Sequence, residues 1–93
     1  MSQQMIECLK ALGDPVRFTI YKRLQQGEVC ACDFLSDLSV AQPTLSFHLK
    51  KMTNCGLIDV QKDGVRQRYT INHDMANKLK SIWDKTDHNN RSE

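Results

Sequence analysis

The sequence predicts a small, mainly α-helical domain that carries one β-hairpin. Apolar residues recur at helical spacing in several separate segments of the 93-residue chain. Two alternating segments, "LIDVQ" and "RQRYTI", flank the turn "KDGV", a pattern typical of a hairpin. A chain of this length has room for one hydrophobic core. We therefore expect one domain over residues 1–88 and a disordered polar tail over residues 89–93.

The first two predicted helices meet at a clear boundary. Gly13 ends the first helix, whose apolar positions are Met5, Cys8, Leu9 and Leu12. Asp14 is suited to cap the second helix and Pro15 to occupy its first position. This second helix is predicted to close at Gly27, and its buried stripe comprises Val16, Ile20 and Leu24.

Three further helices complete the predicted order of helix, helix, short helix, turn, helix, hairpin, helix. The short helix spans roughly Asp33 to Leu38, with inward residues Phe34, Leu35 and Leu38. The next helix begins near Gln42–Pro43 and stops at Gly56, and its core face comprises Leu45, Leu49 and Met52. The last runs from about His73 to Asp87, with apolar residues Met75, Leu79, Ile82 and Trp83.

Composition indicates a globular protein of the cytoplasm. Hydrophobic residues make up 40% and charged residues 26% of the chain, and the net charge is +2. No apolar run approaches the roughly 18 residues that span a membrane, and "MSQQMIECLK" lacks the features of a signal peptide. In a reducing compartment, four cysteines are metal ligands, redox sensors or buried apolar residues more often than disulfides.

Two helices joined by the turn "SDLSVAQP" and followed by a two-stranded ribbon predict a winged helix-turn-helix. Polar residues on an isolated helix face are usually just solvated, but this order of elements favours binding to double-stranded DNA. The first turn of the second motif helix can reach base edges, and a basic hairpin can follow a phosphate backbone. The candidate base contacts are Gln42, Thr44, Ser46 and Phe47, and the candidate phosphate contacts are Lys50, Lys51, Lys62, Arg66 and Arg68.

Four segments, "LKALGDPVRFTIYKRL", "AQPTLSFHLKKM", "CGLI" and "DGVRQRYTI", resemble the motifs of the ArsR/SmtB family in order and spacing. The resemblance covers about residues 6 to 84. It implies a homodimeric winged-helix repressor that releases operator DNA when a metal or metalloid binds. It also adds Pro43 and His48 to the candidate DNA contacts, with a structural role as the alternative for His48.

The sequence departs from the family pattern at three positions that bear on DNA recognition. Ala41 stands where the family has a serine, Phe47 replaces a residue that is more often polar, and Val65 replaces an arginine. These departures leave the operator sequence open. Apolar first and last helices, which a small domain cannot fully cover, predict a homodimer that binds an inverted repeat.

The stretch "EVCACDF" resembles a family box whose two cysteines bind metal in the arsenic-sensing and cadmium/lead-sensing branches. Residues i and i+2 point about 200° apart on a regular helix, so Cys30 and Cys32 could share an ion only from an extended or unwound segment. The resemblance implies no cofactor in the DNA-bound form and As(III), Cd(II) or Pb(II) as inducer. The family's third cysteine is Leu35 here, which leaves Cys8, Asp33, the more distant Cys55 or an exogenous thiol as the further ligand.

Other interpretations remain open. Cys30 and Cys32 could instead respond to oxidants or reactive sulfur, or the domain could have no effector. Packing is the simpler role for Cys8 and Cys55, and helix capping for Asp33. A zinc site on the last helix, around His73, Asp74 and His88, is not expected, because three ligand positions hold Met75, Thr86 and Asn89. No enzymatic activity is expected.

Overall fold

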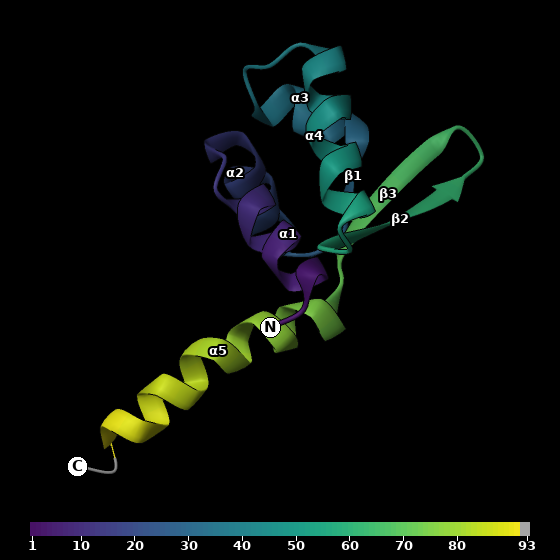
Figure 1. Ribbon diagram of the computed structural model, residues 1–93. Coiled ribbons are helices and arrows are strands. Elements are labelled where there is room, and N and C mark those ends of the chain that lie inside the picture. The colour runs from purple at the N-terminus through teal and green to yellow at the C-terminus, as the bar shows by residue number, and fades with distance from the viewer. Residues whose placement is uncertain (92–93) are drawn as a thin grey trace.

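The computed structural model describes residues 1–91, with the side chains of residues 1–84. Five helices and three strands follow in the order α1 (Gln3–Leu12), α2 (Pro15–Leu24), β1 (Val29–Cys30), α3 (Ala31–Asp37), α4 (Gln42–Asn54), β2 (Ile58–Asp63), β3 (Arg66–Ile71) and α5 (His73–Arg91). In Figure 1, α1 to α4 form the body, the β2–β3 hairpin projects from one side, and α5 extends away from it. The predicted winged helix-turn-helix is therefore confirmed.

The wing belongs to a three-stranded antiparallel sheet of order β1-β3-β2. Strands β2 and β3 pair from Ile58↔Ile71 to Asp63↔Arg66, which leaves a two-residue loop. Gly64 opens that loop with a φ of 65°, and since Val65 has no positive φ the loop has the pattern of a type II′ turn. The sequence did not predict β1, which pairs Cys30 with Arg68 of β3 and so fixes a thiol beside the wing.

The boundary between α1 and α2 forms as predicted. The Asp14 carboxylate accepts hydrogen bonds from the backbone N–H groups of Val16 (2.9 Å) and Arg17 (3.1 Å), and Pro15 takes the first helical position. By contrast, α3 begins at Ala31, two residues before the predicted start, because Cys30 ends β1 in an extended conformation and serves as the N-cap. Asp33 therefore lies inside the first turn and is not the cap.

One core joins all the helices and the sheet. Phe34, Ile20, Met52, Leu57 and Ile58 are among its fully buried side chains. Cys8 is 0% exposed and belongs to this core, which confirms the prediction that it lies on the apolar face of its helix. The prediction that Leu35 points inward is wrong: this side chain is 38% exposed. With α3 starting at Ala31, the helix turns Phe34 to the core, and its neighbour lies about 100° away on the solvent side.

The predictions for the carboxyl-terminal end of the chain fall partly outside the residues that the structure describes. The side chains of Thr86, Asp87, His88 and Asn89 lie outside the described residues, as do residues 92–93. The disordered tail over residues 89–93 therefore stays a prediction. No helix in the described part of the chain is long and apolar enough to cross a membrane.

Candidate DNA interface and thiol site

The exposed face of α4 carries most of the predicted base contacts. Helix α4 starts at Gln42 after Ala41, whose side chain makes no cap hydrogen bond. The candidate contacts exposed along this helix are Gln42, Pro43, Thr44, Ser46, Phe47, Lys50 and Lys51. Phe47 is 54% exposed, and the Lys51 ammonium lies 5.3 Å from the centroid of its ring. The face therefore combines polar, aromatic and cationic groups, as a major-groove surface requires.

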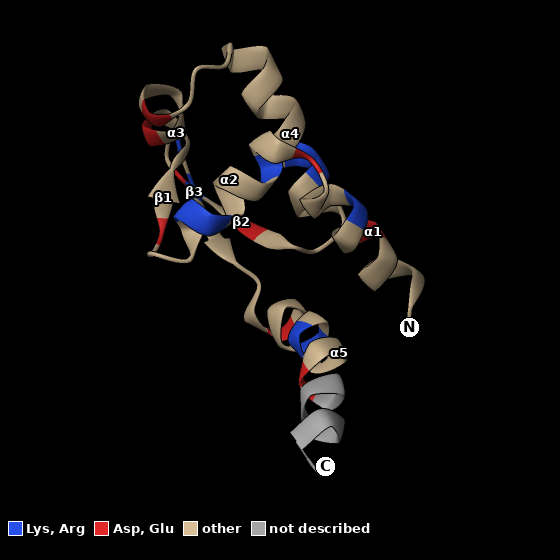
Figure 2. Ribbon diagram, turned by 90° about the vertical axis from the view of Figure 1, so that its left-hand side faces the viewer, with Lys and Arg blue, Asp and Glu red and all other residues tan. Residues whose placement is uncertain are grey.

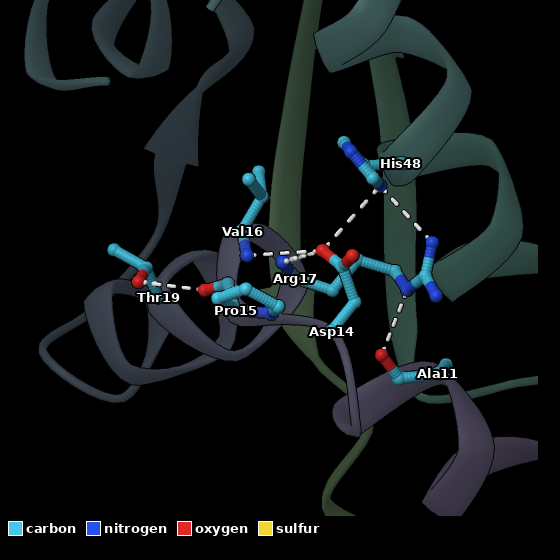
Figure 3. Close-up of polar contacts among 7 residues, drawn as sticks. All are labelled: Ala11, Asp14, Pro15, Val16, Arg17, Thr19 and His48. Atoms are coloured by element: carbon cyan, nitrogen blue, oxygen red, sulfur yellow. Dashed lines mark hydrogen bonds and ion pairs between the residues drawn. The ribbon is translucent and has the colours of Figure 1, made fainter. Parts of the chain in front are cut away.

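His48 lies on the opposite, buried face of α4, where it is 8% exposed. Its Nδ1 lies 3.0 Å from Nη1 of Arg17 and 3.9 Å from the Asp14 carboxylate (Figure 3). Because a guanidinium can only donate, Nδ1 accepts this hydrogen bond and His48 is the neutral Nε2–H tautomer. Of its two expected roles, this position favours the structural one over a DNA contact.

Arg17 connects three elements, a role that the sequence analysis missed. Its Nε donates to the Ala11 carbonyl at 2.7 Å, at the end of α1, while its Nη1 donates to His48 on α4 (Figure 3). The signal available in the sequence was the spacing of Asp14 and Arg17, which share one helical turn. The network fixes the orientation of α4 relative to the α1–α2 corner.

The Asp14 cap makes stability depend on pH in acid. The backbone N–H of Arg17 is the main cause that lowers the pKa of Asp14, and the charge of Arg17 and the backbone N–H of Val16 add to it. A carboxyl group whose pKa is lowered by folding stabilises the protein above its unfolded pKa, and this contribution is lost as the pH falls through the folded pKa. We expect Asp14→Asn to flatten the acid limb of a plot of unfolding free energy against pH, measured by urea denaturation. An unchanged acid limb would contradict the role of this cap.

The wing carries the predicted cations with different degrees of exposure. Lys62 and Arg66 are exposed, whereas Arg68 is half-buried and its guanidinium lies 3.7 Å from the Glu28 carboxylate and 3.5 Å from that of Asp63. Figure 2 shows Lys and Arg in blue on the hairpin, on α4 and on α1, with acidic residues between them. Lys62 and Arg66 are therefore better placed than Arg68 to contact phosphate.

The structure brings the sulfur atoms of Cys30 and Cys32 within 3.2 Å of each other, with the Cys32 thiol donating to Cys30. This is possible because Cys30 is extended, with φ −78° and ψ 145°, while Cys32 lies in the first turn of α3. The expected obstacle of a regular helix is therefore absent, and the pair converges without unwinding. The backbone N–H and the thiol of Cys32 lower the pKa of Cys30, and the hydrogen bond to Cys30 raises that of Cys32.

A cavity of about 290 Å³ connects this thiol pair with the candidate DNA contacts. Besides Cys30 and Cys32, its polar lining includes Gln42 and Ser46 of α4 and Arg66 of the wing. Gln67 and Tyr69 of β3 also line it, and the apolar side chains of the lining are Ala31, Leu35, Leu45, Leu49 and Val65. A group bound to the two sulfurs would therefore lie next to the residues expected to contact DNA.

The described residues supply two thiol ligands but no complete metal site. No group of three or more His, Cys, Asp or Glu side chains among them could hold an ion. Cys8 is buried and donates to the Cys55 carbonyl at 3.2 Å, so the structure does not bring it to the Cys30 and Cys32 sulfurs. Asp33 is exposed beside the pair but does not complete a three-ligand set. The two thiols fit a soft, thiophilic ion that takes its remaining ligands from elsewhere.

The fold and the exposed basic face together define a DNA-binding regulator. The pattern described as "Bacterial regulatory protein, arsR family" matches residues 14–60. The chain is 35% identical over 82 residues to the arsenical resistance operon repressor of Staphylococcus xylosus, covering 88% of this chain and 79% of that protein. The chain belongs to the ArsR family, a family of transcriptional regulators, which confirms the expectation that it is not an enzyme.

Solved structures support the same fold. A crystal structure of an ArsR family transcriptional regulator superposes with a TM-score of 0.82 at 21% identity, covering 100% of this chain and 99% of that chain. A homodimeric winged helix-turn-helix DNA-binding domain from Mycobacterium bovis superposes with a TM-score of 0.73 at 27% identity, covering 90% of this chain and 79% of that one. The first of these similarities shows the fold, and the second structure is that of a homodimer.

Proposed function

We propose that this protein is a homodimeric repressor that releases operator DNA when a thiophilic metal or metalloid binds Cys30 and Cys32, with As(III) as the first candidate. The observation that carries the proposal is the cavity shared by the two thiols, Gln42, Ser46 and Arg66. The 35% sequence identity to an arsenical resistance operon repressor supports As(III) as the ion. Cd(II) and Pb(II) are alternatives, because they also prefer thiolate ligands.

The coupling follows from the position of the site. Arg66 opens β3 at the base of the wing loop, and its charge adds to the hydrogen bonds from Cys32 that lower the pKa of the Cys30 thiol. An ion held by Cys30 and Cys32 changes the charge next to Arg66 and occupies space beside Gln42 and Ser46. An inducer shifts the equilibrium between the DNA-bound and the free protein only if it binds one of the two more tightly. In this proposal, the added charge next to Arg66 and the occupied space beside Gln42 and Ser46 make the ion bind the free protein more tightly.

The third ligand of As(III) would come from outside the protein. As(OH)₃ would exchange two hydroxides for the sulfurs of Cys30 and Cys32, each hydroxide leaving as water with the proton of one thiol. The third hydroxide would stay or be exchanged in the same way for an exogenous thiol. The cavity of about 290 Å³ beside the sulfurs has room for such a small ligand. This arrangement needs neither Cys8 nor Asp33.

Titration of As(III) into the protein bound to DNA from its own upstream region tests this function. We expect fluorescence anisotropy to fall as the reduced protein is released, and Cys30→Ser to raise the required As(III) concentration at least about a hundredfold, since one of two thiolate ligands is lost. Cys55→Ser is the matched control and should respond like the wild type. A phosphine reductant kept in excess separates metal binding from thiol oxidation.

The outcomes distinguish the alternatives. Release by peroxide or polysulfide but not by As(III), Cd(II) or Pb(II) would favour a redox-responsive regulator. DNA binding that none of these agents changes would favour a module without an effector. Release of DNA from Cys30→Ser at the wild-type concentration of As(III) would refute the assignment of the site.

The wing arginines offer a separate test of the DNA surface. We expect Arg66→Ala to weaken binding to all sequences and to reduce the slope of log K against log[salt] by about 1, as loss of one phosphate contact does. Arg68→Ala should change this slope less, because its guanidinium already pairs with Glu28 and Asp63. Equal changes in slope for the two variants, measured by anisotropy at several salt concentrations, would contradict the assignment.

A further inference from the structure

A second pair of cysteines lies apart from the proposed sensor, between α1 and the end of α4. The Cys8 thiol donates a hydrogen bond to the backbone carbonyl of Cys55 at 3.2 Å. The Cys55 thiol in turn donates a hydrogen bond to the Met52 carbonyl at 3.4 Å. Burial raises the pKa of Cys8 to about 12, and the hydrogen bond and charge of the Cys55 thiol contribute to this rise. The two residues are therefore neighbours in space, although 47 positions separate them in the sequence.

The backbone holds both members of this pair in place. Cys8 lies within α1 in the core, and α1 packs against α4. Cys55 is the C-cap of α4 and precedes Gly56, which has a φ of 90°. The N–H of Leu57 bonds the Met52 carbonyl at 3.0 Å and that of Gly56 bonds Thr53 at 3.1 Å, which is the Schellman pattern. This ending fixes Cys55 against α1.

The two thiols differ in access to solvent. Cys8 is 0% exposed, whereas Cys55 is half-buried and lines a surface cavity of about 370 Å³. The charged side chains in this lining are Lys10, Arg17, Lys51 and Glu7. An excess of cations around a partly exposed thiol is typical of reactive cysteines. A solvent-borne oxidant therefore meets Cys55 first, with Cys8 directly behind it.

We propose that Cys8 and Cys55 form a peroxide-oxidisable pair whose disulfide joins α1 to the end of the recognition helix α4. The Cys55 sulfur attacks the peroxide, the O–O bond breaks, and Cys55 becomes a sulfenic acid while one water leaves. The Cys8 sulfur then attacks the Cys55 sulfur and gives up its proton, and the sulfenic hydroxyl leaves as a second water. In total, two thiols lose two electrons to one hydrogen peroxide, and one disulfide forms.

Tryptic fragments distinguish this disulfide from any reaction of the proposed sensor. Cleavage after Lys and Arg places Cys8 in residues 1–10, Cys55 in residues 52–62, and both Cys30 and Cys32 in residues 24–50. The folded full-length protein is treated with hydrogen peroxide, its remaining thiols are blocked with N-ethylmaleimide, and the digest is analysed by mass spectrometry. We expect fragments 1–10 and 52–62 to appear as one cross-linked species that dithiothreitol separates.

Three variants test the order of events. The double variant Cys30→Ser/Cys32→Ser should form the cross-link as the wild type does, with a rise in Tm that dithiothreitol reverses, because the bond closes a long loop. Cys8→Ala should accumulate sulfinic or sulfonic acid on fragment 52–62, since no resolving thiol remains. Cys55→Ser should leave buried Cys8 unmodified under the same treatment.

Other results would overturn the proposal. One is wild-type protein in which Cys55 advances to sulfinic acid while Cys8 stays reduced. Another is the absence of any cross-link once Cys30 and Cys32 are removed. A third is oxidation of Cys8 in Cys55→Ser at the wild-type rate, because that would place the oxidant at Cys8 without passage through Cys55.

Discussion

Phe34→Ala is expected to destabilise the protein by about 3–5 kcal/mol, a large fraction of the stability of a domain of this size. Phe34 is 0% exposed and is the single buried residue of the seven-residue helix α3. Its ring meets that of Tyr69 in β3 edge-on, with centroids 6.4 Å apart. Alanine leaves a cavity at the point where α3 is attached to the sheet.

Urea denaturation followed by circular dichroism measures this effect. Leu35→Ala, at the exposed neighbouring position, is the matched control and should cost less than about 1 kcal/mol. Similar losses for the two variants would contradict the anchoring role of Phe34. Because Cys30 and Cys32 lie at the start of α3, loss of this anchor should also disturb the thiol pair, which thiol titration of the folded fraction can follow.

Trp83→Glu is expected to convert the proposed dimer to monomers and to lower operator affinity by about a hundredfold or more, because a monomer contacts one half-site only. Trp83 is 55% exposed on α5, and Ile6 is 36% exposed on α1, the helix that α5 packs against. These apolar groups fit the proposed pairing through the first and last helices. A carboxylate buried in such an interface is strongly unfavourable.

Sedimentation velocity and anisotropy check this prediction together. Trp83→Phe is the control and should remain dimeric, because it keeps the apolar surface. Met75 and Leu79 of the same helix are buried within the protomer, so deleting α5 would confuse loss of pairing with loss of the core. A Trp83→Glu variant that sediments as a dimer would show that the subunits pair elsewhere.

The elements with strong local signals could be predicted from the sequence. Asp14 and Pro15 start α2, and the turn around Gly64 forms the hairpin, because capping and positive φ are decided within a few residues. Strand β1 could not be predicted, since its two residues acquire their conformation only by pairing with β3, about 40 positions away. That pairing also set the start of α3 and hence the orientation of Leu35.

The candidate site shows the same division. The exposed positions of α4 could be predicted from apolar spacing, which left Gln42, Ser46 and Phe47 outward. His48 could not, because a polar residue next to a core position is expected outside unless it has a buried partner. That partner is Arg17, 31 positions earlier, and only the tertiary structure brings the two together.

The cavity that joins the thiol pair to Gln42 and Arg66 has a consequence for how the proposed sensor is tuned. If an ion there weakens DNA binding by a given factor, DNA must weaken binding of the ion by the same factor. Protein molecules free of the operator are then the better scavengers of the ion, and those on DNA respond last. The threshold for induction is therefore set partly by the number of repressor molecules in excess of their operators, and not by the chemistry of the two sulfurs alone.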